Sequence, residues 1–167
     1  FLHPSDIVHP GVGENGKPDE PVDEARTPDI QQLVSEGGEI LVQVLKDPLG
    51  TKGARLTTFI TIPSRYLVYM PKGRGVGISA RIEDEAERLR LRDAANLFMR
   101  SDETGGYIVR TAAEGATPDA LRADMMFLQK LWAVLGEKAS ATRPGNLVYE
   151  DLPLAVRVMR DVVSSGV

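Results

Sequence analysis

A glycine-rich stretch with two cations, Lys72–Ser79 (KGRGVGIS), has the composition of an anion-binding loop. Glycines let backbone N–H groups approach an anion closely, and Lys72 and Arg74 would add positive charge beside it. The stretch lacks the Gly-Lys-Ser/Thr ending of a nucleotide-binding P-loop and the strand–helix setting of a dinucleotide fingerprint. It therefore indicates a phosphate contact without a nucleotide fold, and a plain flexible turn explains it equally well.

A second pair of residues, Arg110 and Thr111, strengthens the case for phosphate chemistry. Both directly follow an apolar stretch, Tyr107–Val109, that we expect to be a buried strand holding them rigidly. An arginine fork together with a hydroxyl suits a terminal phosphate. The alternative is a surface arginine that caps the end of a strand.

Positive charge is concentrated in the first half of an otherwise acidic chain. The chain carries a net charge of −4, yet seven cations and one anion lie between residues 46 and 81. The cations are Lys46, Lys52, Arg55, Arg65, Lys72, Arg74 and Arg81. This pattern favours a polyanion bound by one face, and the alternative is a solvated surface of mixed charge.

The carboxylates and histidines do not form a convincing metal or hydrolytic site. Glu83, Asp84, Glu85 and Glu87 fall on a predicted helix that offers them salt-bridge partners, and Asp102–Glu103 is an isolated pair. His3 and His9 have no patterned carboxylate nearby, and the chain has no cysteine. We therefore expect no catalytic residue and no metal ligand within this chain.

Two Thr-Pro-Asp sequences mark helix starts, because a hydroxyl cap, a proline in the first turn and an early acid favour a helix N-terminus. They predict helices after Thr27 and after Thr117, the second with an apolar stripe. That stripe comprises Leu121, Met125, Leu128, Trp132 and Leu135. A further helix is predicted over Glu83–Phe98, with Asp84 paired to Arg88.

Short apolar runs predict the strands of an α+β fold. They are Ile40–Leu45, Leu56–Ile62, Tyr66–Met70, Tyr107–Val109 and Leu147–Tyr149. Pro71–Gly77 is predicted to be a loop, as is the acidic stretch His9–Arg26, and a last helix begins near Asp151. A short helix, strand, turn and strand with basic residues fits the end of an OB-type β-barrel, a common binder of single strands.

The chain has 167 residues, which suits one or two domains, and it begins with phenylalanine. We expect it to be a piece of a larger protein. No apolar run reaches the roughly 18–20 residues of a membrane helix, so no membrane partner is expected. The absence of cysteine excludes disulfides within the chain and agrees with a cytosolic origin.

Four long runs resemble the ribonuclease E/G family of bacterial endoribonucleases. They are FLHPSDI at residues 1–7, VQVLKDPLGTKGARLTT at 42–58, IPSRYLVYMP at 62–71 and GYIVRTAAEG at 106–115. The second and fourth runs look closer to the ribonuclease G branch than to the ribonuclease E branch. The resemblance covers nearly the whole chain except residues 9–26.

The resemblance implies a pocket that recognises the 5′-monophosphate of RNA. Arg110 and Thr111 match its phosphate-binding pair, and Val68 matches a residue that packs near the terminal nucleotide. Ser64 falls where the ribonuclease E branch has glycine. That branch also has two consecutive arginines after the residue matching Ser79, whereas here Ala80 and Arg81 follow. Either one phosphate ligand is absent or Arg81 replaces it.

The resemblance also implies a contact site for the RNA chain. Phe1 matches an aromatic stacking platform and Lys52 a phosphate contact beside it. Arg74 and Arg81 are further candidates for binding RNA. Without the resemblance, an initial phenylalanine is more often part of a core and a lysine in a turn is more often only solvated.

The domains implied by the resemblance are the end of an OB-type RNA-binding domain (1–60), an α/β 5′-sensor (61–153) and the start of an RNase H-like segment (154–167). The parent would be an endoribonuclease that cuts single-stranded RNA with a 5′-monophosphate, in rRNA maturation and mRNA turnover. Its magnesium-binding aspartates and zinc-binding cysteines would lie farther toward the C-terminus. A cytoplasmic homodimer or higher oligomer is expected. The rival hypotheses are a non-catalytic RNA-binding module and a partner-binding domain whose basic stretch is incidental.

Overall fold

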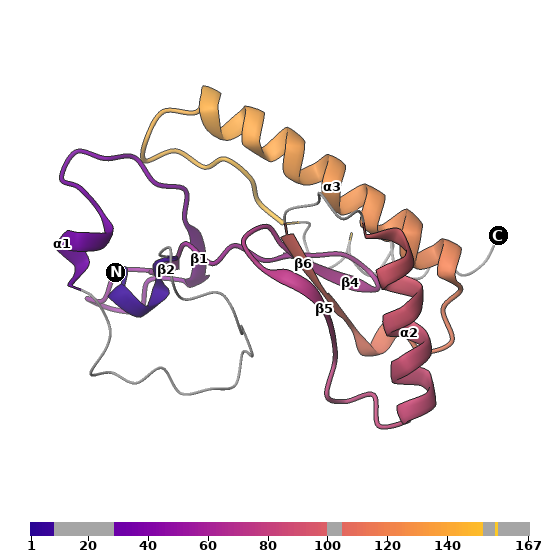
Figure 1. Ribbon diagram of the computed structural model, residues 1–167. Coiled ribbons are helices and arrows are strands. Elements are labelled where there is room, and N and C mark those ends of the chain that lie inside the picture. Colours follow the sequence, from indigo (N-terminus) through magenta and orange to yellow (C-terminus); the bar gives the residue numbers. More distant parts are fainter. Residues whose placement is uncertain (9–28, 100–104, 152–155, 157–167) are drawn as a thin grey trace.

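A computed structural model describes residues 1–8, 29–99, 105–151 and 156, and it is a mixed α+β structure (Figure 1). The α+β class predicted from the sequence is therefore confirmed. The first elements are η1 (Pro4–Asp6), α1 (Ile30–Leu33), β1 (Gln43–Lys46), β2 (Arg55–Thr57), β3 (Ile62–Pro63) and β4 (Leu67–Met70). They are followed by β5 (Arg74–Ile78), α2 (Glu85–Phe98), β6 (Gly105–Val109), η3 (Thr111–Ala113) and α3 (Pro118–Ala141).

The N-terminal part is built on an antiparallel pair, β1 and β2, and the first eight residues are attached to it. Leu2 forms a parallel bridge with Leu56. The Asp6 carbonyl accepts hydrogen bonds from the Thr58 backbone N–H at 2.8 Å and from the Thr57 hydroxyl at 3.1 Å. The Asp6 carboxylate also lies 3.3 Å from the Arg55 guanidinium. These bonds hold residues 1–8 against the strand that precedes the second sheet.

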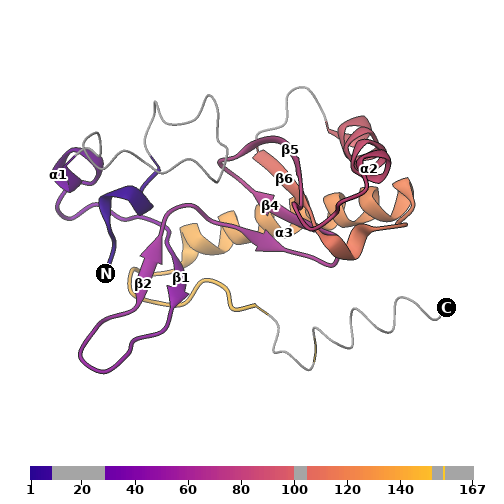
Figure 2. The same cartoon turned by 90° about the horizontal axis from the view of Figure 1, so that it is seen from below.

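The second sheet has four strands in the order β3-β4-β6-β5. β4 is antiparallel to both β3 and β6, whereas β5 and β6 are parallel and are connected through α2. A parallel pair needs such a crossover, because the chain must return to the starting edge before the second strand begins. Figures 1 and 2 both show this sheet packed with α2 and α3, apart from the two-stranded sheet.

Burial alternates along β4, so each face of the sheet has a distinct environment. Leu67 and Tyr69 on β4, with Tyr107 and Val109 on β6, are buried in one core with residues of both helices. The intervening residues Val68, Met70 and Ile108 are only half-buried. α2 and α3 therefore cover one face of the sheet.

The helices begin where capping chemistry places them. Thr117 caps α3 through a bond to the Ala120 N–H, with Pro118 in the first turn, as the sequence predicts. Of its predicted apolar stripe, Leu121, Met125, Leu128 and Leu135 are buried and Trp132 packs against the same core. Asp84 caps α2. Besides these caps, both helices bury residues in the core, and such packing supplies most of a helix's stability in a folded protein.

Several predicted boundaries are wrong. The predicted loop Pro71–Gly77 contains most of β5, because its backbone is paired with β6. The single strand predicted over Leu56–Ile62 is divided into β2 and β3, and Leu147–Tyr149 is not a strand. Asp29 caps α1, and the predicted cap Thr27 lies outside the described residues.

The predicted Asp84–Arg88 pair is also wrong. The Asp84 carboxylate caps the N-terminus of α2, and the Arg88 side chain binds backbone carbonyls. The predicted acidic loop His9–Arg26, the pair Asp102–Glu103 and all of the predicted last helix except Asp151 and Val156 lie outside the described residues. Within the part of the chain that is described, no helix is long and apolar enough to cross a membrane.

Two glycines at the start of β6 allow the neighbouring strands to approach closely. A Cβ on Gly106 would lie 2.7 Å from the Arg74 backbone nitrogen on β5. A Cβ on Gly105, whose φ is +120°, would lie 2.6 Å from the Tyr69 hydroxyl oxygen on β4. Both distances are shorter than van der Waals contact, so these positions require glycine.

We predict that Gly106→Ala destabilises the fold by about 1–3 kcal/mol, because the added methyl group meets backbone that cannot move aside without breaking the β5–β6 pairing. The matched control is Gly136→Ala on α3, where a Cβ meets nothing within 4 Å. This control should stabilise the helix by about 1 kcal/mol. Urea unfolding of both variants measures the two changes, and a neutral Gly106→Ala would contradict the close approach.

Candidate functional site

Three turns meet at one end of the four-stranded sheet, which we call the carboxyl end because β5 and β6 both finish there. The Ser79 N–H donates to the Val109 carbonyl at 2.9 Å, which brings the turn after β5 beside the end of β6. The Arg110 N–H donates to the Tyr66 carbonyl at 2.8 Å, which brings the β3–β4 turn to the same place. In open sheets, ligands commonly bind outside the carboxyl ends of parallel strands.

Arg110 and Thr111 lie at the centre of the carboxyl end, immediately after β6. Both are exposed, and Nη1 of Arg110 donates to the Ser64 carbonyl. A guanidinium has five N–H donors. Among the described residues, the rest of this fork is open to an anion. The predicted pair is therefore held rigidly and presented to solvent.

Ser64 and Val68 are brought close to this pair in different ways. Ser64 is only 2% exposed, and its hydroxyl donates to the Asp124 carboxylate at 2.6 Å. It therefore meets Arg110 through its backbone carbonyl and not through its side chain. Val68 is half-buried on the sheet face that the helices leave open, opposite Ile108 in the strand register.

The β3–β4 turn is tied to α3 by one carboxylate. The same Oδ2 of Asp124 that binds the Ser64 hydroxyl also accepts the backbone N–H of Tyr66 at 2.8 Å and of Leu67 at 3.1 Å. The same turn carries a further cation, Arg65. Its guanidinium lies 4.9 Å from the centroid of the Tyr66 ring.

The turn after β5 is tied to α2 by Arg88. Its Nη1 donates to the Ser79 carbonyl at 2.7 Å and to the Ile82 carbonyl at 2.9 Å. The Glu85 carboxylate lies 3.7 Å from Nε of the same side chain. Arg88 therefore fixes the backbone on both sides of Arg81.

The turn after β6 is tied to α2 by an ion pair. Arg90 donates to the two carboxylate oxygens of Glu87 at 2.6 and 2.7 Å and to the Ala116 carbonyl at 2.9 Å. Glu87 in turn accepts the Gly115 N–H at 2.9 Å. The hydrogen bonds from Arg90, with that from Gly115, lower the pKa of the Glu87 carboxyl from 4.5 to about 2, against a smaller effect of desolvation.

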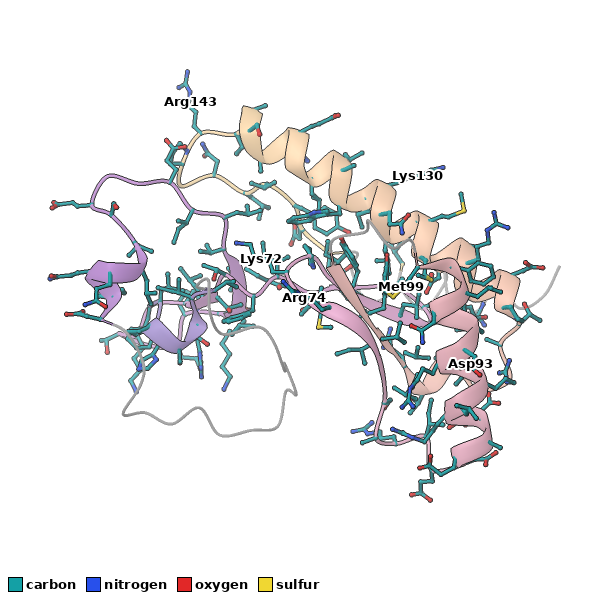
Figure 3. The ribbon with its side chains drawn as sticks, in the orientation of Figure 1. Lys72, Arg74, Asp93, Met99, Lys130 and Arg143 are labelled. Atoms are coloured by element: carbon teal, nitrogen blue, oxygen red, sulfur yellow. The ribbon has the colours of Figure 1, made fainter. Side chains whose placement is uncertain are left out.

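Arg74 in the glycine-rich stretch and Arg81, two residues beyond it, lie at opposite ends of the sheet. Arg81 is exposed at the carboxyl end, beside a surface pocket of about 380 Å³ that is otherwise lined largely by acids. These are Glu83, Asp84, Glu87 and Glu114. Arg74 pairs with Gly105 at the start of β5, and Figure 3 shows it with Lys72 at the end facing the two-stranded sheet. Most of the stretch is thus strand β5, with Lys72 just before it, Arg74 at its start and Arg81 beyond its end.

Phe1 and Lys52 are brought together in the N-terminal part. The backbone nitrogen of Phe1 donates to the Ala54 carbonyl at 2.7 Å, two residues beyond Lys52. Lys52 closes the β1–β2 turn through backbone bonds with Leu49. Lys52 is exposed and Phe1 is 71% exposed, so both side chains are accessible to a ligand.

The described residues do not form a metal centre. Within them, no group of three or more histidines, cysteines, aspartates or glutamates could hold a metal ion. The acids beside Arg81 are instead engaged in part as a helix cap at Asp84 and an ion pair at Glu87.

Comparison with known proteins identifies the family. A sequence model of the Ribonuclease E/G family matches residues 61–167. The chain is 45% identical to Ribonuclease G of Haemophilus influenzae and 46% identical to Ribonuclease G of Escherichia coli, over 99% and 96% of its length. It is 44% identical to Ribonuclease E of a Nostoc species over 83% of its length.

The chain belongs to the ribonuclease E/G family. It covers 33% of the Haemophilus protein, 32% of the Escherichia coli protein and 20% of the Nostoc protein. The chain thus spans about a third of the length of these Ribonuclease G relatives.

Sequence reasoning missed the side chains that anchor the three turns. For Asp124 a signal was present, because Leu121, Asp124, Met125 and Leu128 follow the i, i+3, i+4, i+7 pattern of one helix face. An acid within a buried stripe needs partners. For Arg88 no such signal exists in the sequence. Its hydrogen bonds go to backbone carbonyls, whose positions depend on the path of the turn after β5.

We predict that the stability contributed by Glu87 depends on pH. The pKa of its carboxyl is lower in the folded chain, so the contribution is complete above about pH 4.5 and is lost as the pH falls toward 2. The difference in urea midpoint between the native chain and Glu87→Gln should therefore shrink over that range. The control is Asp93→Asn, an exposed carboxylate of the same helix, and an unchanging difference for Glu87→Gln would contradict the depressed pKa.

Proposed function

We propose that this chain is the RNA-binding and 5′-monophosphate-sensing portion of a ribonuclease G-like endoribonuclease. The observation that carries the proposal is the position of Arg110 and Thr111. They are exposed at the carboxyl end of the sheet, where three anchored turns converge. Membership in the ribonuclease E/G family supports the assignment of the ligand as RNA.

The 5′-phosphate would bind to the Arg110 fork and the Thr111 hydroxyl. A terminal monophosphate carries roughly −1.5 to −2 charges at neutral pH and three acceptor oxygens, more than an internal phosphodiester offers. A guanidinium can bind two of those oxygens at once. Val68, on the open face of the same sheet, would pack near the first nucleotide, and Ser64 would act by orienting Arg110 through its carbonyl.

Arg81 is placed to contribute a further positive charge at the same end. The neighbouring acids of its pocket, Glu83 and Glu114 among them, repel phosphate and reduce what Arg81 can add. The phosphate therefore sits on the Arg110 side of this end, and Arg81 contacts the RNA chain beside it.

The RNA would continue from the sensor toward the N-terminal part. Arg74 and Lys72 lie at the sheet end that faces the two-stranded sheet (Figure 3), where they can neutralise internal phosphates. Beyond them, Phe1 offers a surface for base stacking, which is sequence-tolerant, and Lys52 offers a phosphate contact.

The same proposal covers the longer protein. Residues 1–60 would end an OB-type domain, residues 61–153 would form the 5′-sensor, and residues 154–167 would begin an RNase H-like segment. The parent would hydrolyse single-stranded RNA in the cytoplasm, in rRNA maturation and mRNA turnover, as a homodimer or higher oligomer. By the same resemblance, the residues that bind magnesium and zinc in the parent would lie farther toward the C-terminus, outside this chain.

We predict that Arg110→Ala weakens the binding of 5′-monophosphorylated RNA about tenfold or more and spares 5′-hydroxyl RNA. The reason is the loss of charge-assisted bonds worth about 1.5–3 kcal/mol each. Arg110→Lys should recover only part of the loss, because an ammonium has no fork. The measurement is a pair of titrations at one salt concentration, with oligonucleotides that differ only at the 5′ end.

The matched control for Arg110→Ala is Arg92→Ala, which removes an exposed arginine from α2. It should leave the ratio between the two RNAs unchanged. Equal losses for both RNAs in Arg110→Ala would make Arg110 a general backbone contact and would refute the sensor assignment.

We predict that Lys52→Ala weakens RNA binding to the same degree whatever the 5′ end. A lysine on an internal phosphate carries no information about the end group, and its loss should reduce the salt dependence of binding by about one counterion. Titrations over a series of salt concentrations measure both effects. A loss confined to 5′-phosphorylated RNA would contradict the assignment of Lys52 to the RNA track.

A further inference from the structure

We propose that Asp124 is a positioning residue for 5′-monophosphate recognition, because it fixes the β3–β4 turn that orients the Arg110 guanidinium. This inference rests on the proposed function. Asp124 lies on α3 and would not touch the RNA. It would act through Ser64 and Tyr66, whose carbonyls hold Arg110.

Three hydrogen bonds converge on one carboxylate oxygen of Asp124. Oδ2 of Asp124 accepts the Ser64 hydroxyl at 2.6 Å, the Tyr66 N–H at 2.8 Å and the Leu67 N–H at 3.1 Å. All three donors belong to the β3–β4 turn and the first residue of β4. A single carboxylate thus sets the backbone orientation of the whole turn.

The β3–β4 turn in turn holds Arg110 through two hydrogen bonds. The Tyr66 carbonyl accepts the Arg110 N–H at 2.8 Å, and the Ser64 carbonyl accepts Nη1 of the Arg110 side chain. Arg110 is therefore held at its backbone and at its guanidinium by the two residues whose own polar groups bind Asp124. A rotation of this turn would move both of these acceptors together.

The turn holds Arg110 without neutralising the charge of its guanidinium. The Ser64 carbonyl is neutral, so it orients the arginine without cancelling its charge, and the fork remains available to an anion. The compensating carboxylate lies behind the turn, half-buried in the face of α3. A direct Asp124–Arg110 ion pair would instead compete with phosphate for the guanidinium. The arrangement therefore fixes the fork and keeps it cationic.

The experiment compares Asp124→Ala and Asp124→Asn with Arg110→Ala in the 167-residue chain, using oligonucleotides that carry a 5′-monophosphate or a 5′-hydroxyl. We expect Asp124→Ala to weaken binding of the phosphorylated RNA about tenfold, as Arg110→Ala does, and to leave 5′-hydroxyl RNA within about twofold. Asp124→Asn should recover part of the loss, because an amide oxygen still accepts hydrogen bonds from the turn. Asp124→Ala combined with Arg110→Ala should lose no more than Arg110→Ala alone.

The matched control is Glu137→Ala, which removes an exposed carboxylate from the same helix and should change neither affinity. Equal losses for both RNAs, or additive losses in the double variant, would show a purely structural role and overturn the inference. Should Asp124→Ala fail to fold, Asp124→Asn decides alone: the inference then requires a loss confined to the phosphorylated RNA. If Asp124→Ala binds both RNAs like the native chain while Arg110→Ala is selective, only this inference fails. If Arg110→Ala is not selective, the proposed function fails with it.

Discussion

The parallel pairing of β5 with β6 is the constraint on which the carboxyl end of the four-stranded sheet depends. Two parallel neighbours must finish at the same end of a sheet, so the turn after β5 and the turn after β6 are brought together although α2 separates them in sequence. The antiparallel pairing of β4 with β6 then adds the turn before β4 to the same end. Arg110, Arg81 and the Ser64 carbonyl therefore meet there as a consequence of strand direction.

The helices contribute to this end of the molecule in a second way besides covering the core. Each turn is bound by an ionised side chain from a helix: Asp124 from α3, and Arg88 and Glu87 from α2. Such bonds to charged groups are stronger than neutral ones, and they fix main-chain groups instead of flexible side chains. An anion that arrives at Arg110 therefore meets a surface that needs little reorganisation, which limits the entropy lost on binding.

The sequence alone identified the parts of the fold that depend on local chemistry. The cap at Thr117 and the apolar stripe of α3 were predicted because capping and helical periodicity are written in neighbouring residues. The position of Arg110 and Thr111 was predicted because they follow a short buried strand. β5 was missed because its glycines favour a loop, and only pairing with β6 makes this segment a strand.

The site was harder to predict than the fold, because its support comes from residues distant in sequence. Asp124 lies 60 residues from Ser64, and Arg110 lies 46 residues from the carbonyl that orients it. Arg74 and Arg81 were both candidates for binding RNA, and nothing in the sequence indicated how far apart they lie. A strand of five residues at about 3.3 Å each separates them, so Arg81 lies at the carboxyl end of the sheet and Arg74 at the opposite end.

The glycines that open β6 have a consequence for the distant end of that strand. The side chains of a sheet change faces with every residue, so a slip of one position between β5 and β6 would exchange the buried and open sets. A slip in one direction would also bring Tyr107 to the place where Gly106 meets the Arg74 backbone, and only hydrogen fits there. The contact at Gly106 thus excludes a slip of the two strands in that direction. The position of Ser79 relative to Arg110, four residues farther along the strands, therefore depends in part on the absence of a side chain at Gly106.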